Sequence, residues 1–175
     1  LVNTDISTHI QICKHRLTSL NSESARYKEL KEDKFYLPED WGNIGCSDTV
    51  WFDKYYAEEP RFGIGEKWKS ILCEYTELGN SLYHKCLKDL EPVLGRKRAK
   101  ESARFFKTYN SQIQGDLMFN MRSFANFIRL RNSEHAQVEI RQLAKKMIEL
   151  VENIPGKPFE HTLSAWRECG VYDPN

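Results

Sequence analysis

The chain has 175 residues, and its 26 Lys and Arg residues nearly balance its 25 Asp and Glu residues, giving a formal net charge of +1. This length is enough for one domain with a hydrophobic core and too short for two. The charge balance argues against a dedicated nucleic-acid-binding or membrane-surface protein, because those classes carry a clear basic excess. No apolar run approaches the roughly 18 residues that a membrane-spanning helix needs.

The first predicted element is a helix. Ile6, Ile10, Cys13 and Leu17 recur at helical spacing, with Thr4 or Asp5 as its cap, although residues 2–12 also alternate as in a strand. A hydroxyl-rich polar segment follows over residues 18–26. Residues 31–65 contain two prolines and many aromatic side chains, which indicates an ordered, functional loop rather than a linker.

Helices are predicted over most of the remaining chain, because apolar residues recur there every three or four positions. We expect them over residues 68–90, 99–106, 117–128, 140–151 and 159–166. The Asn132-Ser133 pair ends the third of these helices, and Pro155-Gly156 ends the fourth. The pattern is mostly helical with some strand, so we assign an α+β fold in a single domain over residues 1–175.

The cysteines suggest neither a disulfide framework nor a metal site. Their number is odd, and no two have C-x-x-C spacing; they are Cys13, Cys46, Cys73, Cys86 and Cys169. His84 and Cys86 lie two positions apart on a helix and cannot face one ion, so we expect a packed helix there. We therefore predict reduced thiols in a cytoplasmic or similar compartment, and no bound metal.

Two stretches carry candidate binding chemistry. Residues 11–27 contain Lys14, His15 and Arg16 and then several hydroxyls, a set that could hold a phosphate or could form a solvated polar loop. Residues 120–135 place Arg122, Asn126 and Arg129 on one face of an otherwise apolar helix. Arg131 then lies at the end of that helix, and His135 is expected to open the next one. A plain surface stripe is the alternative interpretation of this second stretch.

The motif Lys14-His15-Arg16-x-x-Ser19-x-Asn21-x-x-Ser24-x-Arg26-Tyr27 resembles the signature R-H-R-x-x-S-x-N-E-x-S-x-R-Y of flavin-dependent thymidylate synthases, the thymidylate synthase complementing protein family. A second block resembles the C-terminal motif of the same family. It reads Asn120-Met121-Arg122-Ser123-Phe124-x-Asn126-Phe127-x-x-Leu130-Arg131 and then His135-Ala136-Gln137-x-Glu139-Ile140. The resemblance covers essentially the whole chain, the 31–65 loop least.

The resemblance implies a mostly helical domain with a small antiparallel sheet, and a cytoplasmic enzyme, or one in the host cytoplasm if a virus encodes it. The expected reaction is the reductive methylation of dUMP at C5 to dTMP, with FAD as cofactor and NADPH and 5,10-methylenetetrahydrofolate as co-substrates. The expected assembly is a homotetramer with shared active sites, without nucleic acid or membrane as partners. Family members carry an upstream segment that contributes to the flavin site, and this chain begins after it, as a fragment or as a naturally short form.

The resemblance also assigns roles to residues. The expected dUMP ligands are Gln11, Lys14, Ser22, Glu23, Ser24, Arg26, Arg104 and Arg131. The expected FAD ligands are Lys14, His15, Arg16, Asn120, Arg122, Asn126 and His135. Arg131 is the expected catalytic residue, because the family's arginine at this position favours ionisation of the uracil ring at N3.

Three positions depart from the family pattern. Lys14 replaces the first signature arginine, and Ser22 replaces the signature glutamate, with Glu23 one place later. The segment Phe105-Phe106-Lys107-Thr108 stands where the family has an apolar stretch that ends in proline. Two alternatives therefore stay open: an enzyme that modifies C5 of a pyrimidine nucleotide differently, for example by hydroxymethylation, and a flavin- or nucleotide-binding protein without catalysis.

Overall fold

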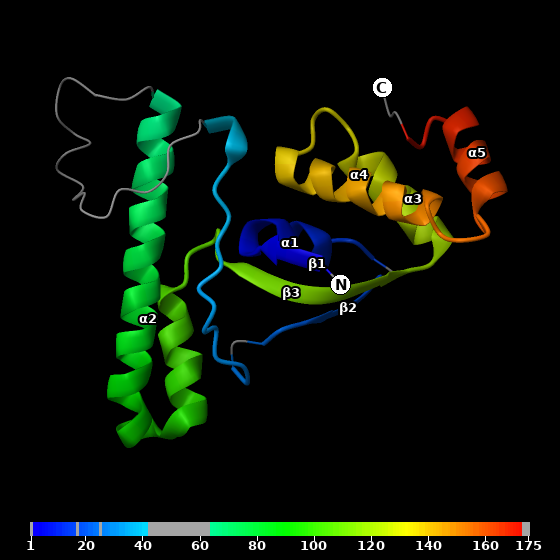
Figure 1. Cartoon of the computed structure of the whole chain (residues 1–175). Coiled ribbons are helices and arrows are strands. Elements are labelled where there is room, and N and C mark those ends of the chain that lie inside the picture. Colours follow the sequence, from blue (N-terminus) through cyan, green and yellow to red (C-terminus); the bar gives the residue numbers. More distant parts are fainter. Residues whose placement is uncertain (1, 17, 25, 42–63, 173–175) are drawn as a thin grey trace. The chain divides into compact units, whose positions relative to one another are not determined.

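The computed structural model describes residues 2–16, 18–24, 26–41 and 64–172, and Figure 1 shows them as a ribbon. The strands are β1 (Val2–Asp5), β2 (Thr18–Ser22) and β3 (Gln112–Phe119). The helices are α1 (Ile6–Cys13), α2 (Ile64–Ala103), α3 (Met121–Arg131), α4 (Val138–Glu152) and α5 (Glu160–Glu168), with 3-10 turns η1 (Glu39–Trp41) and η3 (Arg104–Phe106). The strands form an antiparallel sheet in the order β1-β3-β2, which confirms the α+β assignment.

The chain divides into two compact units that share strands of this sheet. Unit 1 comprises Leu1–Val2, Thr8–Asn21 and Gly115–Asn175, and unit 2 comprises Asn3–Ser7 and Ser22–Gln114. The single domain over residues 1–175 stays a prediction. Among the described residues, no helix combines the length and the apolar character that crossing a membrane requires.

The core of unit 1 is formed by the apolar faces of α1, α3 and α4. Its fully buried members are Ile12, Phe127, Ile128, Ile140 and Ala144. From α5, Trp166 packs on this core. The helices predicted over 140–151 and 159–166 are thus confirmed, since apolar residues at helical spacing form one buried stripe on each helix.

The start of α3 corrects the prediction of a helix from residue 117. Leu117 and Met118 belong to strand β3, where Leu117 and Phe119 pack on the core while Met118 is exposed. The helix begins only at Met121, because the Asn120 side chain caps it: Oδ1 accepts a hydrogen bond from the Ser123 N–H at 2.8 Å.

The N-terminal region combines both predicted alternatives. A short strand, β1, precedes helix α1, which ends at Cys13. The predicted helix end near Leu17 is therefore wrong, because residues 14–16 already form a turn after the helix; Leu17 itself lies outside the described residues. Thr18–Ser22, the first part of the hydroxyl-rich polar segment for which no strand was predicted, forms strand β2, because its backbone pairs with β3.

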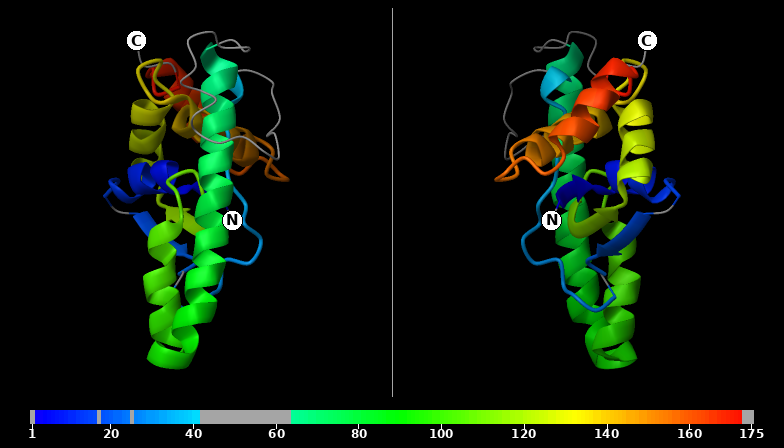
Figure 2. Two further views of the ribbon diagram at one scale, coloured as in Figure 1. Left: turned by 90° about the vertical axis from the view of Figure 1, so that its left-hand side faces the viewer. Right: turned by 90° about the vertical axis from the view of Figure 1, so that its right-hand side faces the viewer.

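In unit 2, α2 is a helical hairpin. Gly95 has φ 74° and ψ 155°, a conformation that side chains with a Cβ rarely adopt, and it separates a first arm (64–94) from a second arm (96–103). The two arms run side by side in both views of Figure 2. Tyr83 and Leu87 of the first arm pack against Ala99 and Ala103 of the second. This confirms two separate helices, although the second ends at Ala103 and Phe106 lies in η3.

Two further predictions concern residues 31–65 and the cysteines. Residues 31–41 are irregular as expected; Phe35 makes an isolated antiparallel bridge to Ser111, and residues 42–63 lie outside the described part. Cys13, Cys86 and Cys169 are free thiols, but Cys73 is disulfide-bonded. The prediction of reduced thiols is therefore wrong for Cys73.

Gly79 lies where η3 meets the first arm of α2. A Cβ at this position would lie 2.6 Å from the Phe106 carbonyl oxygen. An alanine normally stabilises a helix interior relative to glycine by about 1 kcal/mol. For Gly79→Ala we expect the opposite sign, a loss of about 1 to 2 kcal/mol in the free energy of unfolding, because the backbone must move apart. Chemical denaturation would measure it, with the exposed Ser81→Ala as control; a Gly79→Ala protein as stable as the wild type would contradict this packing.

Candidate functional site

In unit 1, three consecutive signature residues follow the end of α1. The Lys14 N–H donates to the Gln11 carbonyl at 3.4 Å and the His15 N–H to the Ile12 carbonyl at 3.1 Å, so the chain turns directly after the helix. Lys14 and Arg16 are exposed, whereas His15 is half-buried, with its ring 4.8 Å from the ring of Phe127. The turn therefore separates two exposed cations from a histidine that packs on the core.

Arg131 contacts this histidine. It is the last residue of α3, and its Nε donates a hydrogen bond to His15 Nε2 at 2.8 Å. Accepting this bond requires a neutral imidazole. The pKa of His15 lies below its ordinary value, because burial and then the Arg131 charge both disfavour the protonated ring. Within the described ranges Arg131 makes no ion pair, so its terminal nitrogens remain available to a ligand.

The predicted polar stripe on α3 is exposed. Arg122, Asn126 and Arg129 all face away from the core, and Arg129 Nη2 donates to Asn126 Oδ1 at 3.2 Å. Asn120 precedes them and uses its side-chain oxygen to cap the helix, which leaves its amide NH2 group for other contacts. The capping role of Asn120 was missed, although an asparagine before a helical stripe is a known capping signal.

His135 is exposed. The prediction that it begins the next helix is wrong. It lies in the turn before α4, which starts at Val138, and its backbone N–H donates to Ser133 Oγ at 3.3 Å. Gln11 does reach this region: its Nε2 donates to Gln137 Oε1 at 2.5 Å. Sequence reasoning gave no role to Gln137, because no local pattern links residues this far apart in the chain.

In unit 2, the residues after β2 form a turn. The Tyr27 and Lys28 N–H groups both donate to the Ser24 carbonyl at 2.9 Å, and Ser24 Oγ accepts the Arg26 N–H at 3.4 Å. Ser22 is the last residue of β2, and the carboxylate of Glu23 is paired with Lys28. Glu23 thus has a local ion-pair partner, and its predicted role as a dUMP ligand stays a prediction.

The two arginines of this group have different surroundings. Arg26 Nε donates to Glu101 Oε1 at 2.8 Å, and this contact lowers the pKa of Glu101. One edge of the Arg26 guanidinium is therefore held, and its central carbon lies 5.6 Å from the centroid of the Tyr27 ring, while its terminal nitrogens have no hydrogen-bond partner in the part of the chain that is described. Arg104 lies in η3 and is exposed, with its guanidinium carbon 6.0 Å from the ring centroid of Phe105.

Contacts among the site residues occur within each unit. Gln11, His15, Arg131 and Gln137 make direct contacts within unit 1, and Ser24 and Arg26 share one turn in unit 2. In the described ranges, no group of three or more His, Cys, Asp and Glu side chains could hold a metal ion.

The contact between Arg131 and His15 leads to a titration experiment. For Arg131→Met we expect the pKa of His15 to rise toward the ordinary imidazole value of about 6.5, since the variant removes a nearby positive charge and a hydrogen bond to the neutral ring. NMR titration of the His15 ring would measure the shift. Arg129→Met, on the exposed face of α3, should leave this pKa unchanged, and an unchanged or lower value in Arg131→Met would contradict the contact.

Comparison with known proteins connects these residues to one family. The family model described as thymidylate synthase complementing protein matches residues 1–155. The chain is 31% identical over 183 residues to the flavin-dependent thymidylate synthase of Rickettsia bellii, a match that covers 95% of this chain and 60% of that protein.

Two further relatives agree. The flavin-dependent thymidylate synthase of Thermosipho melanesiensis is 33% identical, in a match that covers 93% of this chain and 66% of that protein. The flavin-dependent thymidylate synthase of Rickettsia conorii is 32% identical, in a match that covers 85% of this chain and 54% of that protein. The chain thus spans about 54 to 66% of the length of these three relatives. The chain belongs to the thymidylate synthase complementing protein family.

Proposed function

We propose that this chain is a flavin-dependent thymidylate synthase, which methylates dUMP reductively at C5 and releases dTMP. Family membership supports the general activity, since the matched relatives are named flavin-dependent thymidylate synthases. The observation that carries the proposal for this chain is the environment of Arg131. It is a half-buried cation oriented by a neutral histidine, and no carboxylate of the described residues pairs with it.

Arg131 has the chemistry that this reaction needs. The C5 carbon of uracil is a weak nucleophile, and it becomes stronger when negative charge develops on the ring, as on ionisation at N3. A guanidinium held in place in a partly dry site stabilises that charge without reorganising during the reaction. The hydrogen bond from Nε to His15 holds one edge of the group, so the terminal nitrogens are the ones that would contact the ring.

The phosphate of dUMP requires other cations. Within unit 2 we assign Arg26 and Arg104 to it, both exposed, with Ser24 as a hydrogen-bonding partner, and within unit 1 the family resemblance assigns Lys14 and Gln11 to dUMP. Glu101 holds the Nε edge of Arg26 and leaves the terminal nitrogens, which match the geometry of a phosphate. Lys14 keeps the charge of the signature arginine but lacks its planar fork, so it would act as a point charge.

A set of unit 1 residues fits an anionic dinucleotide, and the family resemblance assigns Lys14 to both ligands. Lys14, Arg16 and Arg122 are exposed cations, and Asn120, Asn126 and His135 add polar groups. In the described ranges none of the three cations is paired with a carboxylate, which leaves their charges for the FAD pyrophosphate. When bound, FAD reduced by NADPH supplies hydride, while 5,10-methylenetetrahydrofolate supplies the one-carbon unit. The protein would bind and align these flat molecules.

We also propose a homotetramer with shared active sites. The proposed substrates further suggest the cytoplasm, or the host cytoplasm for a viral protein. The homotetramer, the location in the cytoplasm, and NADPH and methylenetetrahydrofolate as co-substrates are all proposed on the basis of family membership.

A second candidate function rests on the paired Glu23. Because its carboxylate is engaged with Lys28, Glu23 does not take over the position of the signature glutamate that Ser22 replaces. An enzyme that leaves a hydroxymethyl group at C5 would be consistent with this difference, and so would a protein that binds nucleotide without turnover.

Absorbance and product analysis separate these functions. We expect purified protein to show flavin bands near one FAD per chain, and to release tritium from C5-labelled dUMP when NADPH and methylenetetrahydrofolate are present. Mass spectrometry of the product should give dTMP; a hydroxymethylated nucleotide would favour the second function. A colourless protein that takes up no added FAD would exclude both enzymatic functions.

Replacing Arg131 should separate catalysis from cofactor binding. In Arg131→Ala we expect turnover to fall by about 100-fold or more while flavin content changes little, because the residue stabilises charge on the substrate ring. Steady-state kinetics and the flavin absorbance of the same preparation would measure both quantities. Lys145→Ala, at an exposed position of α4, is the control, and an equal loss of turnover and flavin in Arg131→Ala would contradict the assigned role.

A further inference from the structure

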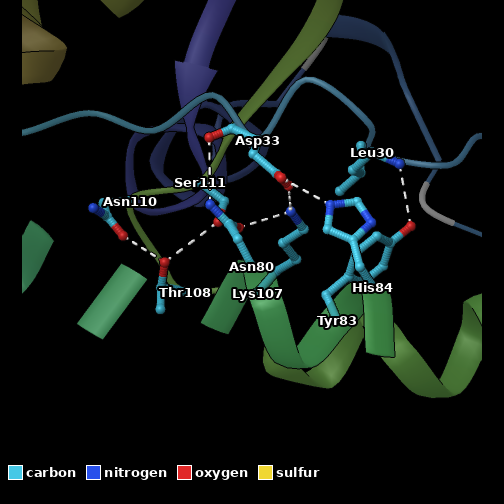
Figure 3. Close-up of polar contacts among 9 residues, drawn as sticks. All are labelled: Leu30, Asp33, Asn80, Tyr83, His84, Lys107, Thr108, Asn110 and Ser111. Carbon is cyan, nitrogen blue, oxygen red and sulfur yellow. Dashed lines mark hydrogen bonds and ion pairs between the residues drawn. The ribbon is translucent and has the colours of Figure 1, made fainter. Parts of the chain in front are cut away.

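Lys107 departs from the family pattern and carries a buried charge. Its side chain is only 4% exposed. The ammonium group donates to Asp33 Oδ1 at 2.5 Å and to Asn80 Oδ1 at 2.8 Å, and it lies 4.5 Å from the ring centroid of Tyr83. Figure 3 shows Lys107 between Asp33 and Asn80. A buried ammonium is tolerated only with such partners, so its position depends on them.

Asp33 is held from several directions. Its second carboxylate oxygen is 2.8 Å from His84 Nε2, and its carbonyl accepts a hydrogen bond from Asn80 Nδ2 at 3.4 Å. Its backbone has φ +47°, a left-handed conformation that aspartate adopts more readily than most residues. Burial raises the pKa of Asp33, but Lys107 and His84 outweigh that effect and lower it. Both the backbone and the charge of Asp33 are thereby fixed.

The residues between Arg26 and Asp33 run along α2. The Leu30 N–H donates to Tyr83 Oη at 3.1 Å, and Lys100 Nζ donates to the Tyr27 carbonyl at 2.6 Å. Arg26 pairs with Glu101, and Glu29 pairs with Arg96 at 3.1 Å.

These contacts differ in how well solvent screens them. The pairs of Arg26 and Glu29 involve exposed arginines, and exposed ion pairs contribute little to stability. The pair formed by Lys107 is shielded from solvent at the ammonium. Among these ion pairs it is therefore the one best suited to fix the segment.

We propose that Lys107 is a positioning residue: through Asp33 and Asn80 it fixes residues 26–33 along α2 and so orients Ser24 and Arg26 toward the phosphate of the nucleotide substrate. This inference rests on the proposed function, which assigns Ser24 and Arg26 to that phosphate. It also gives a physical role to Lys107, which lies in the segment 105–108 that departs from the family pattern.

The test compares Lys107→Met with wild type, both as the full chain loaded with FAD. We expect the KM and the Kd for dUMP to rise about tenfold, because Arg26 and Ser24 lose their fixed position, while kcat and flavin content change less than about twofold. Hydrogen exchange should show faster exchange at the Leu30 amide. Lys85→Met, an exposed lysine on the first arm, is the matched control and should behave like wild type.

Further variants keep the test decisive. Lys107→Met with Asp33→Asn removes both charges of the pair and should show the same KM effect if the single variant does not fold. Tyr83→Phe removes only the hydroxyl that holds Leu30, and it should raise the KM with kcat unchanged. Lys107→Arg keeps the charge and should restore part of the affinity.

Three outcomes would overturn the inference or its basis. Wild-type KM and exchange in Lys107→Met would overturn the positioning role alone, since the wild type still binds dUMP. Equal losses of kcat, flavin and dUMP affinity would indicate a general structural role and would also overturn it. A wild-type protein that binds neither FAD nor dUMP would refute the proposed function itself, and the positioning role with it.

Discussion

The constraint on which unit 2 depends is that a buried ammonium must be paired. Lys107 meets it with Asp33 and Asn80, and the ring of Tyr83 lies beside it. Asn80, Tyr83 and His84 follow i, i+3, i+4 spacing and therefore lie on one face of the first arm of α2. This face contacts Lys107 and Asp33. Gly79 lets the backbone of η3 approach this face closely. Asp33 in turn fixes the chain that leads back to the signature residues.

Unit 1 contains a half-buried cation, Arg131, whose surroundings differ from those of Lys107. Arg131 is oriented by a neutral histidine and, in the described ranges, lacks a carboxylate partner. Lys107 is satisfied inside the protein, whereas Arg131 retains donors for a ligand. This difference separates a cation that stabilises structure from one suited to an anionic substrate, because the Lys107 ammonium is shielded from solvent by its partners, whereas His15 engages only the Nε of Arg131.

Several signature residues also have structural tasks. Asn120 caps α3, Glu23 pairs with Lys28, and the Nε of Arg26 is held by Glu101. The motif therefore combines two kinds of constraint in one set of side chains: they complete local structure, and they leave selected donors exposed. Glu23 follows Ser22, the residue that replaces the signature glutamate, and its carboxylate is paired with the exposed Lys28.

The amino-acid sequence by itself determined the helices of α4 and α5, the polar stripe on α3 and the two family motifs, because periodicity and spacing are local properties that the printed residues contain. It misjudged the start of α3 and the state of Thr18–Ser22, since a strand exists only when its partner is present. Only the tertiary structure decided the pairs Arg131–His15 and Lys107–Asp33, whose members are 116 and 74 positions apart. Packing brings such residues together and removes water around them, and no local pattern encodes that proximity.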